Sequence, residues 1–291
     1  MSATTAITLR KMNGLGNEFA VLDLRPRARR FSEAEVRRIA DRARGVGCDQ
    51  VIALEPSPAG ADAFMRIWNS DGGEVEACGN AMRCVASLLA GEIGRNTVRI
   101  ETRDGVLGGA INPDGTVTVD MGVPRFAWNE IPLAEEFHDT RQIELQVGPI
   151  DAPVLHSPSV VNVGNPHCIF WVDDVNAHDL ARIGPMLEHH PLFPQRANIS
   201  LAQVSAPDAI LLRVWERGAG LTRACGTAAC AVAVAAHRKG LAGRSVTVTL
   251  PGGPLHIHWR ESDDHILMTG PSELEYESTL DPALLDGETV S

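Results

Sequence analysis

Short apolar runs, many with alternating polar positions, account for most of the regular pattern along the chain and predict β-strands. In the first half the runs are ITLRKM, FAVLDL, VIALE, AFMRIW, TVRIET and TVTVDM. In the second half they are SVVNVG, CIFWV, ISLAQV, AILLRVW, VTVTL, PLHIHW and HILMTG. The segment NPDG, which ends at Gly115, is typical of a hairpin turn between two such strands.

Two helices are predicted in the first half. Residues 32–44 have helical spacing, and Ser32 begins them as a capping residue, with Glu35 completing a capping box. The second helix begins just after Cys78, where apolar positions recur at helical spacing. It is expected to run to about Ala90 and to end at Gly91, because glycine commonly ends a helix.

The second half contains two more predicted helices. Residues 178–189 have helical spacing and are expected to be interrupted at Gly184-Pro185. The small-residue run after Cys225 predicts a helix that stops at Gly240.

One stretch of the sequence occurs twice. Residues 66–85 read RIWNSDGGEVEACGNAMRCV, and residues 213–232 read RVWERGAGLTRACGTAACAV. The copies are 147 residues apart, and eight of their 20 aligned positions are identical. Gly16-Asn17 and Gly164-Asn165 keep nearly the same separation. The chain is therefore predicted to contain two related, pseudo-symmetric halves.

The halves give the expected domain boundaries. The first domain is predicted to comprise residues 1–123 plus 271–285 and to carry Cys78. The second is predicted to comprise residues 124–270 and to carry Cys225. The segment SELEYES near the C-terminus has no counterpart in the first half, so we expect it to return and pair with the first domain.

Composition narrows the classes of function. The chain has 291 residues, of which 44% are hydrophobic and 22% charged, which is ordinary for a globular protein. Its net charge of −11 argues against nucleic-acid binding, and the cluster from Arg25 to Arg30 is interpreted as a solvated surface. No signal-peptide pattern or membrane-spanning apolar run is present, so we expect a cytoplasmic protein that does not bind membranes.

The six cysteines have no CxxC spacing and no histidines at structural zinc spacing, so they are expected to be free thiols. Cys84, Cys168 and Cys230 lie in apolar runs and are predicted to be core residues, and Cys48 is also expected to be structural. His256-x-His258 lacks a third ligand nearby. No metal site is therefore predicted.

Cys78 and Cys225 each lie in an Ala-Cys-Gly sequence at a predicted strand-to-helix turn. The helix N-terminus stabilises a thiolate and can also bind a substrate carboxylate through its N–H groups. Two such thiols, one from each half, suit removal of a proton from one face of a carbon and its return to the other face. The pattern predicts a two-base racemase or epimerase.

Polar residues around the repeats predict an amino-acid substrate. Glu216 and Arg217 can meet an ammonium and a carboxylate. Neither Lys11 nor Lys239 is placed for a Schiff base, so no cofactor is expected. His167 is a candidate supporting residue that can polarise a thiol or position Glu216, or it is simply a loop histidine. Candidate amides for binding a zwitterion are those of Asn17, Gln50, Asn69, Asn80, Asn165 and Asn198.

At this point the chain closely resembles the diaminopimelate epimerase family over nearly its whole length. The motifs that carry the resemblance are NGLGNEF, GCDQ, NSDGGEVEACGNAMRC, VNVGNPH, RANI and WERGAGLTRACGTAAC. The family implies two similar α+β domains, each with a mixed or antiparallel sheet wrapped around a central helix, and an active site in the interdomain cleft. It also implies a homodimer and conversion of LL- to meso-2,6-diaminopimelate without pyridoxal phosphate or metal, for lysine and peptidoglycan precursor synthesis in the cytoplasm.

The resemblance also implies roles for matching residues. Cys78 and Cys225 would be the two acid/base thiols, and Glu216 would bind the reacting α-ammonium. The reacting carboxylate would be held by backbone N–H groups of Gly79, Asn80, Gly226 and Thr227. The distant, non-reacting centre would be held by Asn69, Asn165, Asn198 and Arg217, with Asn17 and Gln50 lining the cleft.

Small departures from the family pattern remove none of these groups. Glu18, Trp68 and Ala228 stand where Asp, a smaller aromatic residue and Gly are frequent. A proline or hydroxyproline racemase of the same architecture is the alternative enzyme, although Arg217 and the amides would then lack a purpose. A protein that binds zwitterions without catalysis is a third reading, which the presence of both thiols disfavours.

Overall fold

The structure is a computed structural model that describes residues 6–27, 29–75, 78–103 and 105–286. The chain divides into two compact units. The first unit comprises Met1–Val119 and Gly270–Ser291, and the second comprises Asp120–Thr269. No helix of the described residues is long and apolar enough to cross a membrane.

The first unit is built on one mixed sheet. Neighbouring strands are antiparallel, except that β2 is parallel to β3 and β4 is parallel to β6. A short strand, β5 (Glu74–Val75), also pairs with β4. Along the sheet the order is β19 (Glu273–Thr279), β1 (Thr8–Gly14), β2 (Asn17–Asp23), β3 (Gln50–Glu55), β4 (Ala63–Asn69), β6 (Thr97–Thr102), β7 (Gly105–Ile111) and β8 (Val117–Asp120). The predicted return of the C-terminal segment to the first unit is confirmed by the β19–β1 pairing.

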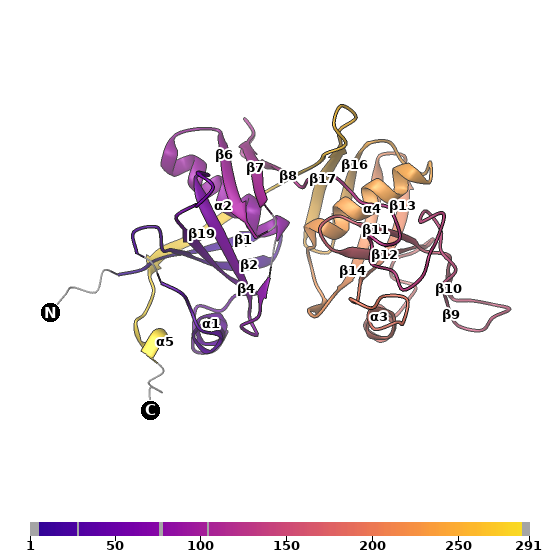
Figure 1. The fold of residues 1–291 in the computed structure, drawn as a ribbon, viewed down its shortest axis with the longest axis horizontal. Helices are drawn as coiled ribbons and strands as arrows, with labels where there is room; N and C mark the ends of the chain where they lie inside the picture. Colours follow the sequence, from indigo (N-terminus) through magenta and orange to yellow (C-terminus); the bar gives the residue numbers. More distant parts are fainter. Residues whose placement is uncertain (1–5, 28, 76–77, 104, 287–291) are drawn as a thin grey trace. The chain divides into compact units, whose positions relative to one another are not determined.

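Helix α2 (Gly79–Ile93) lies on one face of this sheet (Figure 1). It contacts β1 and β2 as well as β6 and β7, which lie towards opposite ends of the sheet, so the sheet curves around the helix. Gly109 in β7 allows the close approach, because a Cβ at that position would lie 2.7 Å from the Cβ of Ala86. The side chains of Val85 and Leu89 are fully buried there.

Helix α1 (Glu33–Ala40) lies on the other face of the first sheet. Its Val36 and Ile39 share a hydrophobic cluster with Val51 and Ala53 of β3. Successive residues of a strand point to opposite faces, so the buried Ile52 faces the side covered by α2. A short helix, α5 (Ala283–Asp286), follows β19 and contacts α1.

The second unit repeats this arrangement. Its parallel pairs are β12–β13 and β14–β16, at the positions of β2–β3 and β4–β6, and the other neighbours are antiparallel. The order is β11 (Ser159–Asn162), β12 (Pro166–Trp171), β13 (Asn198–Ala206), β14 (Ala209–Glu216), β16 (Ser245–Leu250), β17 (Gly253–Trp259) and β18 (Ile266–Gly270), with β15 (Gly220–Leu221) on β14. The duplicated sequence is therefore a duplicated fold.

Helix α4 (Gly226–Arg238) is the counterpart of α2 (Figure 1). It contacts β11 at one side of the sheet and β17 near the other, so this sheet also curves around its helix. Helix α3 (Leu180–Glu188) covers the opposite face, where Leu180 and Leu187 join a cluster with Phe170 and Leu201. Two short strands, β9 (Gln146–Val147) and β10 (Leu155–His156), form a separate ladder.

The capping box at Ser32 and Glu35 is confirmed, but α1 ends at Ala40 rather than at residue 44. The side chain of Asp41 accepts hydrogen bonds from the backbone N–H groups of Ala43 and Arg44, both at 2.8 Å. This local turn replaces the last helical turn, as is common for aspartate.

Two other predictions about helices were wrong. Helix α2 continues past Gly91 to Ile93, because Gly94 is the residue that adopts the left-handed conformation, with φ 71°, and its N–H bonds to Ala90 O at 2.9 Å. Helix α3 is continuous through Pro185, with Asp179 as its N-cap. We attribute this to the packing of α3 on β14 and β15, which offsets the hydrogen bond lost at proline.

Candidate functional site

Cys78 and Cys225 occupy the same backbone position in the two units. Each is the N-cap residue of a central helix, Cys78 of α2 with φ −148° and ψ 112°, and Cys225 of α4 with φ −138° and ψ 106°. Their carbonyls accept the first helical hydrogen bonds, from Met82 at 2.9 Å and from Ala229 at 3.1 Å. The preceding N–H groups of each first turn have no partner within the helix, which makes both sites suited to an anion.

The polar residues of the first unit gather at one edge of its sheet. Asn17 begins β2, Gln50 begins β3 and Asn69 ends β4, and these strand directions bring the three residues to the same edge. Gln50 Nε2 donates to Asn69 Oδ1 at 2.9 Å, and Asn80 Nδ2 approaches Asn17 Oδ1 at 3.5 Å. Gln50 Oε1 is buried and has no hydrogen-bond partner among the described residues.

Asp49 anchors this edge, although no role was predicted for it from the sequence. Its Oδ2 accepts from Asn17 Nδ2 at 3.1 Å and from the Glu18 N–H at 2.9 Å. Its Oδ1 accepts from Arg42 at 2.8 Å. Asp49 lies inside the GCDQ motif, and its position beside Gln50 was the available signal.

The second unit places its predicted residues at the corresponding edge. Asn198 begins β13, Glu216 ends β14, and Arg217 follows it. Asn198 Oδ1 accepts from the Arg217 N–H at 3.0 Å, and Asn198 Nδ2 donates to Pro166 O at 3.0 Å. The Arg217 guanidinium donates to Gln195 O at 3.0 Å.

His167 lies in β12 beside Asn198 of β13, and its side chain is fully buried. Its Nε2 is 2.7 Å from Asn165 Oδ1, so with the amide placed this way Nε2 carries the proton and donates to the oxygen. Its Nδ1 is buried without a partner among the described residues. Burial, followed by the charge of Arg217, lowers the pKa of His167 to about 3, so the ring is neutral at physiological pH.

Cys225 is buried beside a carboxylate. Its burial, followed by the charge of Glu216, raises the pKa of the Cys225 thiol well above 9.0. A hydrogen bond with Thr227 Oγ1, which is 3.5 Å from Sγ, lowers the pKa of the thiol and partly offsets this increase. The Glu216 carboxylate accepts a hydrogen bond from the Thr222 hydroxyl. This environment favours the protonated form of the Cys225 thiol near neutral pH, while Cys78 is partly exposed.

The remaining cysteines are core residues, as predicted. Cys84, Cys168 and Cys230 are fully buried, and Cys48 is 2% exposed. Burial raises the pKa of Cys48 to about 11 and that of Cys84 to about 12. Burial also raises the pKa of Cys168, so none of these three thiols is a thiolate near neutral pH.

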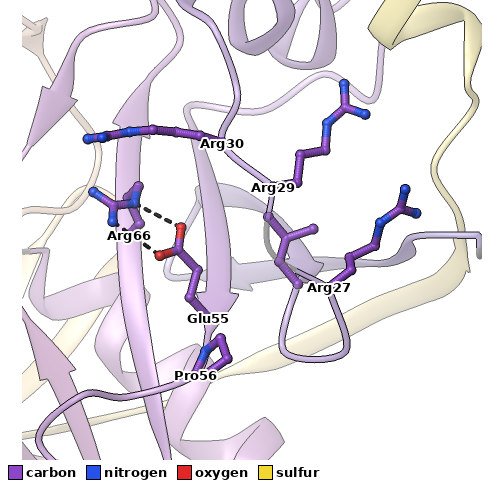
Figure 2. A pocket seen from close by; sticks show the side chains of 7 residues that line it. Arg27, Arg29, Arg30, Glu55, Pro56 and Arg66 are labelled. Atoms are coloured by element: carbon purple, nitrogen blue, oxygen red, sulfur yellow. Dashed lines mark hydrogen bonds and ion pairs between the residues drawn. The ribbon is translucent and has the colours of Figure 1, made fainter.

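The first unit also contains a hollow of about 470 Å³ that is lined mainly by charged side chains (Figure 2). It is lined by Arg27, Arg29, Arg30 and Arg66 together with Glu55. Arg66 is paired to Glu55 through two hydrogen bonds of 2.9 and 3.1 Å, while Arg27 and Arg29 point away from that pair. Of these lining residues, Arg66 alone belongs to a repeated stretch that carries a thiol, and it lies at the start of that stretch. Among the described residues no group of three or more His, Cys, Asp or Glu side chains could hold a metal ion.

Known proteins resemble this chain over nearly its whole length. The family model described as diaminopimelate epimerase matches residues 9–127 and 159–275. The diaminopimelate epimerase of Nitrobacter hamburgensis is 59% identical over 276 residues, covering 94% of this chain and 95% of that protein. That of Brucella anthropi is 58% identical over 282 residues, covering 96% of this chain and 93% of that protein.

Solved structures with the same fold are more distant in sequence. A hydroxyproline epimerase from Agrobacterium vitis has 17% identity and a TM-score of 0.68, covering 97% of this chain and 95% of its own. A probable proline racemase from Agrobacterium radiobacter has 18% identity and a TM-score of 0.65, covering 95% and 94%. At this identity the likeness concerns the fold alone, and it confirms the predicted fold class.

Proposed function

Since the chain belongs to the diaminopimelate epimerase family and is an isomerase, we propose that it interconverts LL- and meso-2,6-diaminopimelate through the thiols of Cys78 and Cys225. The observation that carries the proposal is the identical placement of the two thiols as N-caps of paired helices. Among the described residues, no other pair of cysteines has this symmetry.

The proposed step transfers one proton away from the α-carbon and a second proton to it, and it leaves the oxidation state unchanged. One thiolate takes the α-proton, the C–H electron pair passes into the enolate of the carboxylate, and the opposite thiol gives its proton to the other face of the carbon. The mechanism requires both sulfurs to reach one α-carbon. Cys225 acts as the acid in the direction in which Cys78 is the base, and the two thiols exchange these roles in the reverse direction.

The helix N-termini would stabilise the developing charge. The N–H groups of Gly79 and Asn80 in α2, and of Gly226 and Thr227 in α4, lie in the first helical turns. Such groups bind a carboxylate and are most effective when its charge grows in the transition state. This gives the two helices a role in catalysis as well as in binding.

The polar edges would distinguish diaminopimelate from a simpler amino acid. Glu216 is proposed to bind the reacting ammonium, and Arg217 the distant carboxylate. Asn69, Asn165 and Asn198 would complete the site of the distant centre, with Asn17 and Gln50 as further lining residues. Neutral His167 would hold Asn165 in place rather than transfer a proton.

The wider setting is proposed from the family. The reaction would supply meso-diaminopimelate for lysine and peptidoglycan precursor synthesis in the cytoplasm, with the enzyme as a homodimer. It would need neither pyridoxal phosphate nor a metal ion. The two units are proposed to act as domains.

The direct test is uptake of deuterium from heavy water into LL-2,6-diaminopimelate, with a chelator present and pyridoxal phosphate omitted. We expect label at one α-carbon together with the meso isomer. Folded, reduced protein that gives neither result would refute the proposal. Racemisation of proline or hydroxyproline under the same conditions would instead support the alternative substrate.

A further inference from the structure

The turn that carries Glu216 and Arg217 rests on a buried carboxylate outside all the motifs. Glu188, the last residue of α3, is 3% exposed. Its Oε2 accepts from Trp215 Nε1 at 2.7 Å, and its Oε1 accepts from the Gly218 N–H at 3.0 Å. These two donors flank Glu216 and Arg217 directly in the chain, so one side chain bridges the base of the turn.

The position of Glu188 is unfavourable without these contacts. A carboxylate at a helix C-terminus faces the negative end of the helix dipole, and burial removes its water. The two N–H donors, and Arg196 at 3.7 Å, offset that cost. Since Arg196 is 54% exposed, the backbone and indole contacts are the better-shielded part of the arrangement.

Trp215 is held from a second side by α3. A Cβ at Gly184 would lie 2.4 Å from Cγ of Trp215, so the indole packs directly on the helix backbone. Gly184 and Glu188 are one helical turn apart on α3 and together fix the ring and its N–H. The orientation of the strand end before Glu216 therefore depends on α3.

The first unit holds its corresponding turn by other chemistry. There the backbone carbonyl of Asp71 accepts from the guanidinium of Arg37 in α1, and Trp68 packs edge-on against Phe31 with ring centroids 6.0 Å apart. The two halves thus support equivalent turns with a surface arginine and with a buried glutamate. The buried carboxylate belongs to the unit whose turn carries both charged candidate residues.

We propose that Glu188 is a positioning residue that, through Trp215 and Gly218, fixes the turn presenting Glu216 and Arg217 to a substrate with an ammonium and a second carboxylate. The assignment of those two residues rests on the proposed function. Glu188 itself is not proposed to touch substrate. Its effect should appear mainly in KM, because the turn carries binding groups while the thiol of Cys225 is held by α4.

The test compares Glu188→Gln with the wild-type enzyme. Glutamine has one acceptor oxygen, so its NH2 group must face one of the two donors, and the turn loses one of its supports. We expect KM for LL-diaminopimelate to rise about tenfold and kcat to change less than about threefold. The control is Val248→Ala. Val248 is a buried residue of β16 outside the turn, so this change should lower the melting temperature without raising KM.

A second variant tests the bridge itself. Trp215→Phe removes the indole donor and keeps a ring over Gly184. In the double variant with Glu188→Gln, the single oxygen of glutamine can serve the Gly218 N–H alone. We expect the combined loss in kcat/KM to be smaller than the product of the two single losses.

Equal KM effects of Glu188→Gln and Val248→Ala, or independent effects in the double variant, would overturn the proposal. Hydrogen exchange of the peptide containing Gly218 separates this result from failure of the proposed function. If the wild type lacks epimerase activity, faster exchange at Gly218 in Glu188→Gln still supports the positioning role. Unchanged exchange, relative to Val248→Ala, refutes it.

Discussion

The Thr222 hydroxyl donates a hydrogen bond to Oε1 of Glu216, the carboxylate that also raises the pKa of Cys225. Thr222 lies between β15 and α4, while Glu216 ends β14. The contact therefore joins the strand end to the loop that leads into the second thiol. It orients a charged group that we propose to bind the reacting ammonium.

Thr222→Val tests this contact with little change of shape. A hydrogen bond to a charged group contributes about 1.5–3 kcal/mol, so kcat/KM should fall between about tenfold and a hundredfold. Thr222→Ser keeps the hydroxyl and should remain close to wild type. Steady-state kinetics with LL-diaminopimelate give the comparison. A valine variant with the same kcat/KM as the wild type would show that Thr222 has no role in the site.

The two thiols are tested by Cys78→Ala and Cys225→Ala. We expect either change to lower the rate of epimerisation by at least about a hundredfold, because each direction needs both a base and an acid. Cys230→Ala is the matched control, since Cys230 is a fully buried thiol within α4 and has no proposed chemical role. Near-normal rates in one N-cap variant, with its folding confirmed by circular dichroism, would contradict the two-base mechanism.

His167 should make the protein sensitive to acid. Its pKa is lowered to about 3 in the folded chain from an ordinary 6.5, so the unfolded chain binds the extra proton over this range. The free energy of unfolding is therefore unaffected by this group above about pH 6.5 and decreases as pH falls towards 3. The total decrease is at most about 5 kcal/mol. His167→Gln should flatten this limb of a denaturation profile measured between pH 4 and 7. A parallel profile in the variant would contradict the prediction.

Local sequence signals predicted the regular elements well where the deciding contacts are local. Ser32 and Glu35 form their capping box within three residues, and the hairpin before β8 closes through the Gly115 N–H and Asn112 O at 3.0 Å. The end of α1 failed because the Asp41 side chain competes for backbone N–H groups. The repeat was readable since both copies keep Arg-x-Trp near the ends of β4 and β14 and Cys-Gly at the starts of α2 and α4.

The site was predictable only as far as its residues fall in motifs. The motifs named Asn17, Gln50 and Asn69 as candidates, and the structure brings the three to one edge of the sheet. The carboxylate of Asp49 that holds Asn17 was not predicted, because its partners depend on strand register. Glu188 gave no signal at all, since its contacts with Trp215 and Gly218 arise only when α3 folds over β14. Supporting residues of this kind require the fold before they can be recognised.

Asp49→Asn tests the support of the first unit's edge. An asparagine in place of Asp49 loses the charge that accepts from Asn17 and from the Glu18 N–H, and kcat/KM should fall about tenfold. Arg42→Gln is the control, because it removes the partner of Asp49 Oδ1 and leaves the contacts of Oδ2 in place. The side chain of Arg42 is 58% exposed, and it also pairs with Glu18. Exposed ion pairs contribute about 0–1 kcal/mol, so this control should lose less than about fivefold. If the two variants lose activity equally, the ion pair with Arg42, rather than the contact with Asn17, is what matters at Asp49.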